Sequence, residues 1–349
     1  MGQSVSYEQN PCGLDGIEFI EFCGPDENFL ASFCARLGLK KVGQHKQAAI
    51  QLWRQGDINF LINHQNSGFP AQFKKRHGPS VCSTGFRVKD AHLAYKTAIA
   101  RGARAFEGDK GGWDLPAIYG IGDSLVYFVD EYGARNIYDA RFSYTSPETK
   151  PVGKGLMLID HLTNNVPKGE MQKWCDFYEK VFGFKERRYF DIRGKTTGLI
   201  SKVMRSPCGK FSIPINEPTD PKSQIQEYLD EYHGSGIQHI ALLTRDICQA
   251  VQSLNAEKIE FLAAPPHSYY EMLKDRLANV REDNAKLESL GVLADGDPDG
   301  YLLQIFTKNQ VGPVFIEIIQ RENHFGFGEG NFQALFDAME EDQRRRGVI

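Results

Sequence analysis

The sequence lacks the features that would place the chain in a membrane, on a secretory route or on nucleic acid. No apolar run approaches the roughly 18–20 residues that cross a bilayer. The first ten residues hold neither the basic region nor the apolar core of a signal peptide. The formal net charge of −4 leaves no basic footprint for nucleic acid. These absences predict no membrane or nucleic-acid partner, and the seven scattered cysteines suit a reducing cytoplasm.

Motifs built on cysteine or glycine are also missing. The seven cysteines are odd in number, and no two of them stand as C-x-x-C, which argues against a structural zinc site or a thioredoxin-like motif. The glycine cluster at 326–330 is not followed by a Lys-Ser/Thr pair, and Gly120 and Gly122 lack a third glycine. The sequence therefore predicts no phosphate-binding or dinucleotide-binding loop.

An internal duplication is present instead. With 349 residues the chain is long enough for two domains, each with its own core. Both halves open with a strand-like run and a helical run that ends at a glycine, at residues 13–22 and 28–38 and again at 155–161 and 171–183. Later in each half a strand-like run leads to a helix with Asp90 or Asp246 as the expected N-cap.

Each half therefore reads as the pattern β-α-β-β-β, repeated twice. A polar stretch rich in proline and glycine, residues 143–155, separates the halves and is typical of a linker. We expect an α+β fold of two tandem domains, with residues 1–150 in the first domain and residues 151–349 in the second.

Three strand-like runs of the second half each carry a polar residue that suits metal binding. Glu317 stands at the centre of the apolar run 312–321, where an ionised carboxylate is costly to bury without a positive partner. His161 ends the run 155–161, and His239 lies near the start of the run 236–243. Two imidazoles and one carboxylate form the ligand set that holds non-haem Fe(II) on one face.

A single histidine on an apolar strand is more often part of the core than a metal ligand. The positions of the three residues in the internal repeat therefore decide between these two interpretations. An overlay of the two halves places His161 opposite Phe22, His239 opposite Ser83 and Glu317 opposite Ile137. In this overlay all three candidates occupy repeat-equivalent positions. Core residues with no shared role would not be expected to fall at equivalent positions. The overlay predicts one iron per chain, bound in the second half.

At this point the residues resemble a known family. Six segments in order carry the resemblance: PINEP (214–218), SQIQEYL (223–229), GIQH (236–239), LQIFTK (303–308), FIEIIQR (315–321) and GFGEGNF (326–332). The chain resembles the 4-hydroxyphenylpyruvate dioxygenase family, of the vicinal-oxygen-chelate superfamily, over essentially its whole length. That superfamily is built from paired βαβββ modules, which implies an open barrel of mixed or antiparallel sheet in each domain, with helices outside.

The resemblance implies a complete site. His161, His239 and Glu317 would be the Fe(II) ligands. The family's polar residues around the substrate correspond to Ser201, Asn216, Gln224, Gln238 and Gln304, and its aromatic walls correspond to Phe306, Phe315, Phe332 and Phe336. The implied reaction converts 4-hydroxyphenylpyruvate and O2 to homogentisate and CO2, by decarboxylation, ring hydroxylation and side-chain migration, in tyrosine and phenylalanine catabolism. The first domain would be free of metal and serve structure and assembly, in a homodimer or homotetramer.

Two of these implied roles raise questions of geometry. Strict strand alternation turns Gln238 away from the face of His239, so either the strand bulges there or Gln238 acts from behind the ligand. Phe332, Leu335, Phe336 and Met339 have helical spacing behind the glycines of 326–330. That helix is either docked on the core or a lid over the site, and both can hold.

Three other functions stay open at this stage. Hydroxymandelate synthase uses the same substrate and iron but oxidises the side-chain carbon. An extradiol dioxygenase shares the ligand set but needs a further base histidine near the metal. A metal-free binding or resistance protein of the same superfamily would lack the three ligands. The product formed from 4-hydroxyphenylpyruvate separates these functions.

Overall fold

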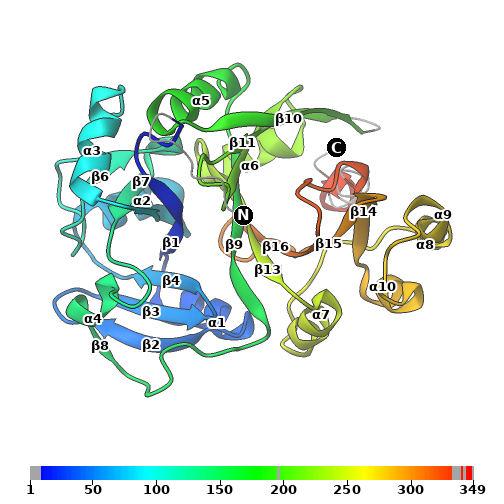
Figure 1. The fold of residues 1–349 in the computed structure, drawn as a ribbon, viewed down its shortest axis with the longest axis horizontal. Coiled ribbons are helices and arrows are strands. Elements are labelled where there is room, and N and C mark those ends of the chain that lie inside the picture. Colours follow the sequence, from blue (N-terminus) through cyan, green and yellow to red (C-terminus); the bar gives the residue numbers. More distant parts are fainter. Residues whose placement is uncertain (1–8, 195–196, 332–338, 341–342, 348–349) are drawn as a thin grey trace.

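The computed structural model describes residues 9–194, 197–331, 339–340 and 343–347 of the chain. Its strands form two eight-stranded sheets, one from each half of the sequence, which Figure 1 shows side by side. The first sheet has the order β6 (Ala117–Tyr119), β7 (Leu125–Val129), β5 (Ser80–Val88), β1 (Leu14–Cys23), β4 (Ile58–Asn63), β3 (Ile50–Gln55), β2 (Lys40–His45) and β8 (Phe142–Tyr144). The second sheet has the order β10 (Lys185–Arg193), β11 (Gly198–Arg205), β12 (Ser212–Pro218), β9 (Leu156–Asn165), β13 (Gly236–Thr244), β16 (Phe315–Glu322), β15 (Gly300–Phe306) and β14 (Leu293–Asp297).

Helices connect these strands. Asp90 and Asp246 cap two of them as expected, since each carboxylate accepts a hydrogen bond from the backbone N–H three residues later. The helices of the first half are α1 (Glu27–Arg36), α2 (Gly68–His77), α3 (Ala91–Ala100), η1 (Ile121–Asp123) and α4 (Ile137–Arg141). Those of the second half are α5 (Met171–Phe177), η2 (Tyr178–Phe182), α6 (Gln224–Tyr232), α7 (Ile247–Ala256), α8 (His267–Glu271), α9 (Leu273–Arg276), α10 (Asn284–Leu290) and η3 (Glu329–Asn331). No helix in the described part of the chain is long and apolar enough to cross a membrane.

The two sheets repeat one pairing scheme, which confirms the predicted α+β fold of two tandem units. In each sheet two central strands pair antiparallel, β1 with β5 and β9 with β13. Each central strand also has a parallel neighbour on its outer side, namely β4, β7, β12 or β16. The halves differ at both edges. Strand β8 has no counterpart in the second sheet, and the counterpart of β14 in the first half is reduced to an isolated bridge between Ala105 and Ile118. The second module of the first half is therefore shorter than the predicted βαβββ.

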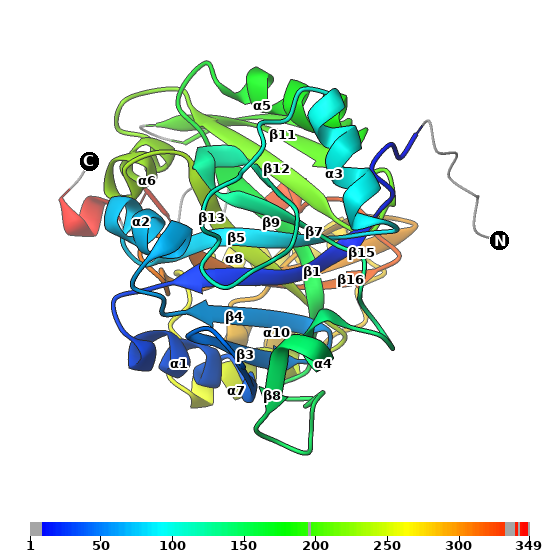
Figure 2. The same cartoon turned by 90° about the vertical axis from the view of Figure 1, so that its left-hand side faces the viewer.

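The halves pack against each other through aromatic side chains. Phe86 of β5 lies 5.7 Å from Phe182 and 5.1 Å from Phe211, measured between ring centroids. The predicted linker 143–155 begins inside β8, and Gly56 donates a backbone hydrogen bond to the Pro151 carbonyl at 2.8 Å. Seen from the side, the first half covers the central strands of the second (Figure 2). A polar side chain on those central strands must therefore find its partners inside the protein.

Candidate metal centre

Three adjacent strands of the second sheet bring His161, His239 and Glu317 together. In the register of the sheet, His161 of β9 and Glu317 of β16 both pair with Ala241 of β13. His239 precedes Ala241 by two residues, so its side chain leaves the same face of β13. Directly paired residues also share a face. The sheet therefore points all three side chains to one side, above the small side chain of Ala241.

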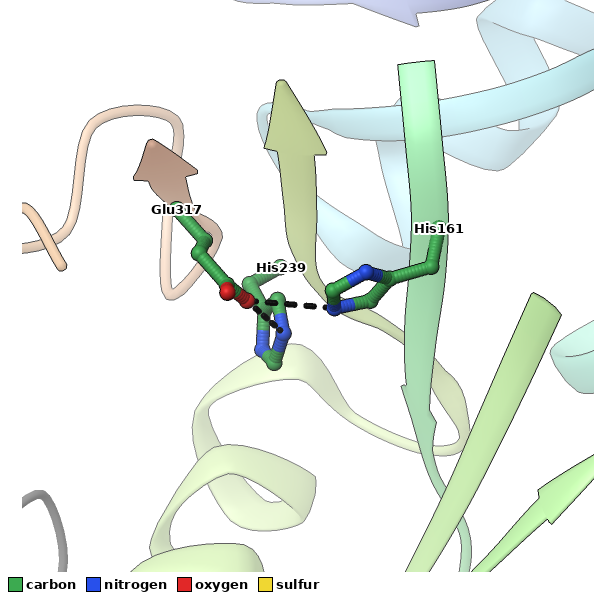
Figure 3. Close-up of side chains that lie close together, drawn as sticks. All are labelled: His161, His239 and Glu317. Carbon is green, nitrogen blue, oxygen red and sulfur yellow. Dashed lines mark ion pairs between the residues drawn. The ribbon is translucent and has the colours of Figure 1, made fainter. Parts of the chain in front are cut away.

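The ligand atoms of these residues converge. Glu317 Oε2 lies 3.1 Å from His161 Nε2 and 3.2 Å from His239 Nε2 (Figure 3). The side chains are buried, and within the described residues they are the one group of three histidine, cysteine or acidic side chains close enough to share a metal ion. Two imidazole nitrogens and one carboxylate suit Fe(II) with open positions for other ligands.

Burial and mutual contact set the charges at this centre. Burial would raise the pKa of Glu317, but the two histidines lower it to about 2. Burial would also lower the pKa of His161, but the Glu317 and Asp160 carboxylates raise it to about 9. For His239, burial holds the pKa below its usual value. A buried, ionised carboxylate requires a positive partner, and a divalent metal between the imidazoles would supply one.

The residue before each histidine holds its ring from behind. His161 Nδ1 donates to Asp160 Oδ2 at 2.8 Å, and His239 Nδ1 donates to Gln238 Oε1 at 3.1 Å. Both partners sit at breaks in the strand register, because the pairing of β9 with β13 shifts at Asp160 and again at Gln238. A β-bulge turns the extra side chain toward the side of its neighbour. With Nδ1 occupied in this way, Nε2 of each ring faces the centre.

This geometry answers the question about Gln238, since the strand does bulge and the amide does contact the back of His239. The sequence missed Asp160, because strict alternation assigns it to the opposite face. An acidic residue directly before a candidate ligand was the available signal.

A cavity opens above the three residues, and six of the nine predicted substrate residues line it: Ser201, Asn216, Gln224, Gln238, Phe306 and Phe315. The register explains the aromatic pair, since Phe315 pairs with His239 and Phe306 pairs with Glu317. Ser201, Asn216 and Asn165 form a polar row across β11, β12 and β9. Oε1 of Gln224 is buried without a hydrogen-bond partner among the described residues.

Of the other three predicted residues, Gln304 alone belongs to the described part of the chain, and it does not line this cavity. Gln304 is fully buried beside Gly328, and neither atom of its amide has a partner among the described residues. Gly328 has φ +80°, and a Cβ there would meet the Gln304 amide at 2.3 Å, so only glycine fits this approach. Phe332 and Phe336 lie outside the described residues. The cavity is also lined by Met339, from the helix predicted near the C-terminus, and by six residues that the sequence did not assign to the site: Thr163, Ile192, Leu199, Val203, Pro214 and Phe327.

The overlay with the first half was right for Ser83 and wrong for the other two positions. Ser83 pairs with Glu21 and Leu125 as His239 pairs with Thr163 and Phe315. The residues that flank Gly85, the counterpart of Ala241, are Phe19 and Tyr127. Phe22 lies three residues beyond Phe19, the residue that takes the place of His161, and Ile137 lies in a helix.

Aromatic packing and a buried carboxyl group fill the corresponding place in the first sheet. Phe19 lies 5.4 Å from Trp113 and 6.0 Å from Tyr127 between ring centroids. Glu21 is fully buried beside them and accepts hydrogen bonds from Ser83 Oγ (2.5 Å), Asn63 Nδ2 (2.8 Å) and Trp113 Nε1 (2.9 Å). The first half therefore has a packed core at the place where the second half has His161, His239 and Glu317.

Comparison with known proteins gives matches over both halves. Residues 7–143 match the N-terminal domain family described as hydroxyphenylpyruvate dioxygenase. Residues 158–305 match the glyoxalase, bleomycin resistance protein and dioxygenase superfamily. Protein MelA of Shewanella colwelliana is 50% identical over 347 residues, which covers 99% of this chain and 100% of that protein.

Two further matches concern function and fold. The 4-hydroxyphenylpyruvate dioxygenase of Legionella pneumophila (strain Philadelphia 1) is 50% identical over 344 residues, covering 97% of this chain and 98% of that protein. A solved structure of a mutant 4-hydroxymandelate synthase from Streptomyces coelicolor superposes with a TM-score of 0.81 at 24% identity, covering 95% of this chain and 99% of that one. The second match shows the shared fold of two tandem glyoxalase-like domains.

Proposed function

Since the chain belongs to the 4-hydroxyphenylpyruvate dioxygenase family, we propose that it converts 4-hydroxyphenylpyruvate and O2 to homogentisate and CO2. The observation that carries this proposal is the buried convergence of His161, His239 and Glu317 beneath a cavity with aromatic and amide walls. The atoms balance, because the substrate carboxyl group leaves as CO2 and homogentisate takes both oxygen atoms of O2, one in its new carboxylate and one in its new ring hydroxyl. The reaction belongs to tyrosine and phenylalanine catabolism.

We assign the metal as Fe(II), with His161, His239 and Glu317 as its protein ligands. Fe(II) held on one face would supply open positions at which an α-keto acid and O2 bind side by side. The chain orients the ligand nitrogens through Asp160 and Gln238, as their hydrogen bonds to the two Nδ1 atoms indicate.

The cavity walls have two tasks in this proposal. Phe306 and Phe315 flank the ligands and would hold the aromatic ring of the substrate while excluding water. The amides of Asn216, Gln224 and Gln238 would bind its polar groups. Oε1 of Gln224, which has no partner among the described residues, is a ready acceptor for a hydroxyl. Ser201 would extend the polar wall. By family resemblance, Gln304, Phe332 and Phe336 would join the site, with the last two on a helix that closes over it.

Product analysis tests the function directly. The protein loaded with Fe(II) under anaerobic conditions is mixed with 4-hydroxyphenylpyruvate and oxygenated buffer, and the products are separated by chromatography. We expect homogentisate and CO2 in equal amounts. Hydroxymandelate as the main product would assign the chain to the synthase activity instead. Absence of turnover with bound metal would leave ring cleavage of a catechol or a binding role, which a catechol substrate separates.

The number of metal ions bound per chain tests the proposed ligand set and the proposal that only the second half binds metal. We expect one Fe(II) per chain, because the first sheet has Phe19, Ser83 and Tyr127 where the second has ligands. Elemental analysis after gel filtration, with protein measured by amino-acid analysis, gives the ratio. A ratio near two would mean a second site that this assignment omits. We also propose that the chain assembles into a homodimer or homotetramer and that it acts in the cytoplasm.

A further inference from the structure

Arg321 lies at the end of β16, four residues after Glu317, and binds the carboxylate behind His161. Its Nε donates to Asp160 Oδ1 at 2.8 Å and its Nη2 donates to Asp160 Oδ2 at 2.8 Å. This is a two-point contact between a planar guanidinium and a carboxylate, with each side chain 12% exposed. Oδ2 of Asp160 also accepts the hydrogen bond from His161 Nδ1. The guanidinium therefore fixes the carboxylate that fixes the ring.

The remaining nitrogen of Arg321 holds a different part of the chain. Nη1 donates to the backbone carbonyl of Gly326 at 2.6 Å and to that of His324 at 3.2 Å. The guanidinium also lies over the ring of Phe327, 5.5 Å from its centroid. These contacts fix residues 324–327, the segment that leads from β16 toward the C-terminal helix predicted from the sequence.

Phe327 contacts both Arg321 and His161. Its ring meets the ring of His161 edge-on, with centroids 5.2 Å apart, and it lines the cavity above the metal centre. His161 is thus held by Asp160 on one side and contacted by Phe327 on the other, and both of these residues contact Arg321. A displacement of residues 324–327 would therefore change the position of His161 in two ways, through Arg321 and Asp160 and through Phe327.

We propose that Arg321 is a positioning residue that couples the orientation of the metal ligand His161 to the path of residues 324–328. The inference rests on the proposed iron site. An arginine is required because its fork binds the carboxylate at two points and still has a nitrogen for the backbone carbonyls. A lysine would keep the charge beside Asp160 but could not make both sets of contacts at once.

Arg321→Lys tests the proposal, with Co(II) as a spectroscopic substitute for Fe(II). We expect the variant to fold, to bind Co(II) about 10–100-fold more weakly than wild type, and to show an altered visible Co(II) spectrum. Hydrogen exchange in the peptide that contains 324–328 should be faster. The matched control is Arg188→Lys, because Arg188 pairs with Glu329 next to the same segment but is 58% exposed. That variant should retain wild-type affinity, spectrum and exchange.

A measurement on the wild-type protein covers the case in which Arg321→Lys does not fold. Coupling between two sites is reciprocal, so saturating Co(II) should slow hydrogen exchange in 324–328. Unchanged exchange on metal binding, or an Arg321→Lys protein with wild-type affinity and spectrum, would overturn the proposal. A wild-type chain that binds no Co(II) would overturn the iron site as well, and the wild-type titration alone identifies that outcome.

Discussion

His239→Ala is expected to abolish turnover of 4-hydroxyphenylpyruvate and tight Fe(II) binding while leaving the fold intact. His239 contributes one of three converging ligand atoms, and its Nε2 lies 3.2 Å from Glu317 Oε2. An alanine there leaves two protein ligands, and no other histidine, cysteine or acidic residue of the described chain is placed to complete the set. Iron content after gel filtration, circular dichroism and the homogentisate assay measure the three expectations.

Matched variants make this experiment specific. His161→Ala and Glu317→Ala should behave in the same way, since each residue supplies one ligand atom. His92→Ala is the control, because His92 is exposed on α3 in the first half. It should retain full iron and full activity. Stoichiometric iron together with near-normal turnover in His239→Ala would show that the ligand set is wrong.

Glu21→Ala is expected to cause a large loss of stability in the first half. The carboxylate accepts hydrogen bonds from Ser83, Asn63 and Trp113 in a fully buried position. Its removal leaves three buried donors without that acceptor, at about 1–3 kcal/mol for each. We therefore expect a total loss of about 3 kcal/mol or more. Chemical denaturation followed by the fluorescence of Trp113 and its neighbours measures it.

Glu21→Gln separates the shape of this residue from its charge. Burial raises the pKa of Glu21 even though neighbouring donors oppose that shift. The folded state therefore holds the proton more tightly than the unfolded state. The resulting stabilisation is complete below the unfolded pKa of about 4.3 and is lost as the pH rises through the folded pKa. The thermal midpoint of Glu21→Gln should rise relative to wild type as the pH increases, and parallel pH profiles would contradict this account.

The sequence predicted the repeat, the fold class and the three converging residues because these depend on period and local pattern. A polar residue inside each of three apolar strand-like runs could be recognised without knowledge of the register. The overlay failed at Phe22 because it aligned Gly16 with Gly155, whereas Gly13 precedes Phe19 by the same spacing as Gly155 precedes His161. It failed at Ile137 because the second half carries α8, α9 and α10 between β13 and β16, so the two segments differ in length. In the first half, Ser83 was placed correctly because the two nine-residue strands β5 and β13 run in step.

The contacts around the ligands depend on pairings that a single sequence does not contain. Asp160 and Arg321 are 161 residues apart in sequence, and a bulge is needed before the carboxylate turns toward the histidine. Phe327 was read only as part of a glycine-rich stretch, since its contact with His161 depends on where Arg321 holds the backbone. Strand alternation predicts which face of a sheet a side chain leaves. These contacts depend in addition on which residues of neighbouring strands are paired and on where the strands bulge.

The wide spacing of the three proposed ligands has a consequence for how the protein is made. His239 lies 78 residues after His161, and Glu317 lies a further 78 residues along the chain. The three neighbouring strands that carry them must all pair before the ligand atoms meet, and such distant pairings form slowly. A nascent chain that ends before β16 would present two imidazoles and no carboxylate. Iron uptake is therefore expected to follow synthesis of nearly the whole chain, as a late step in its maturation.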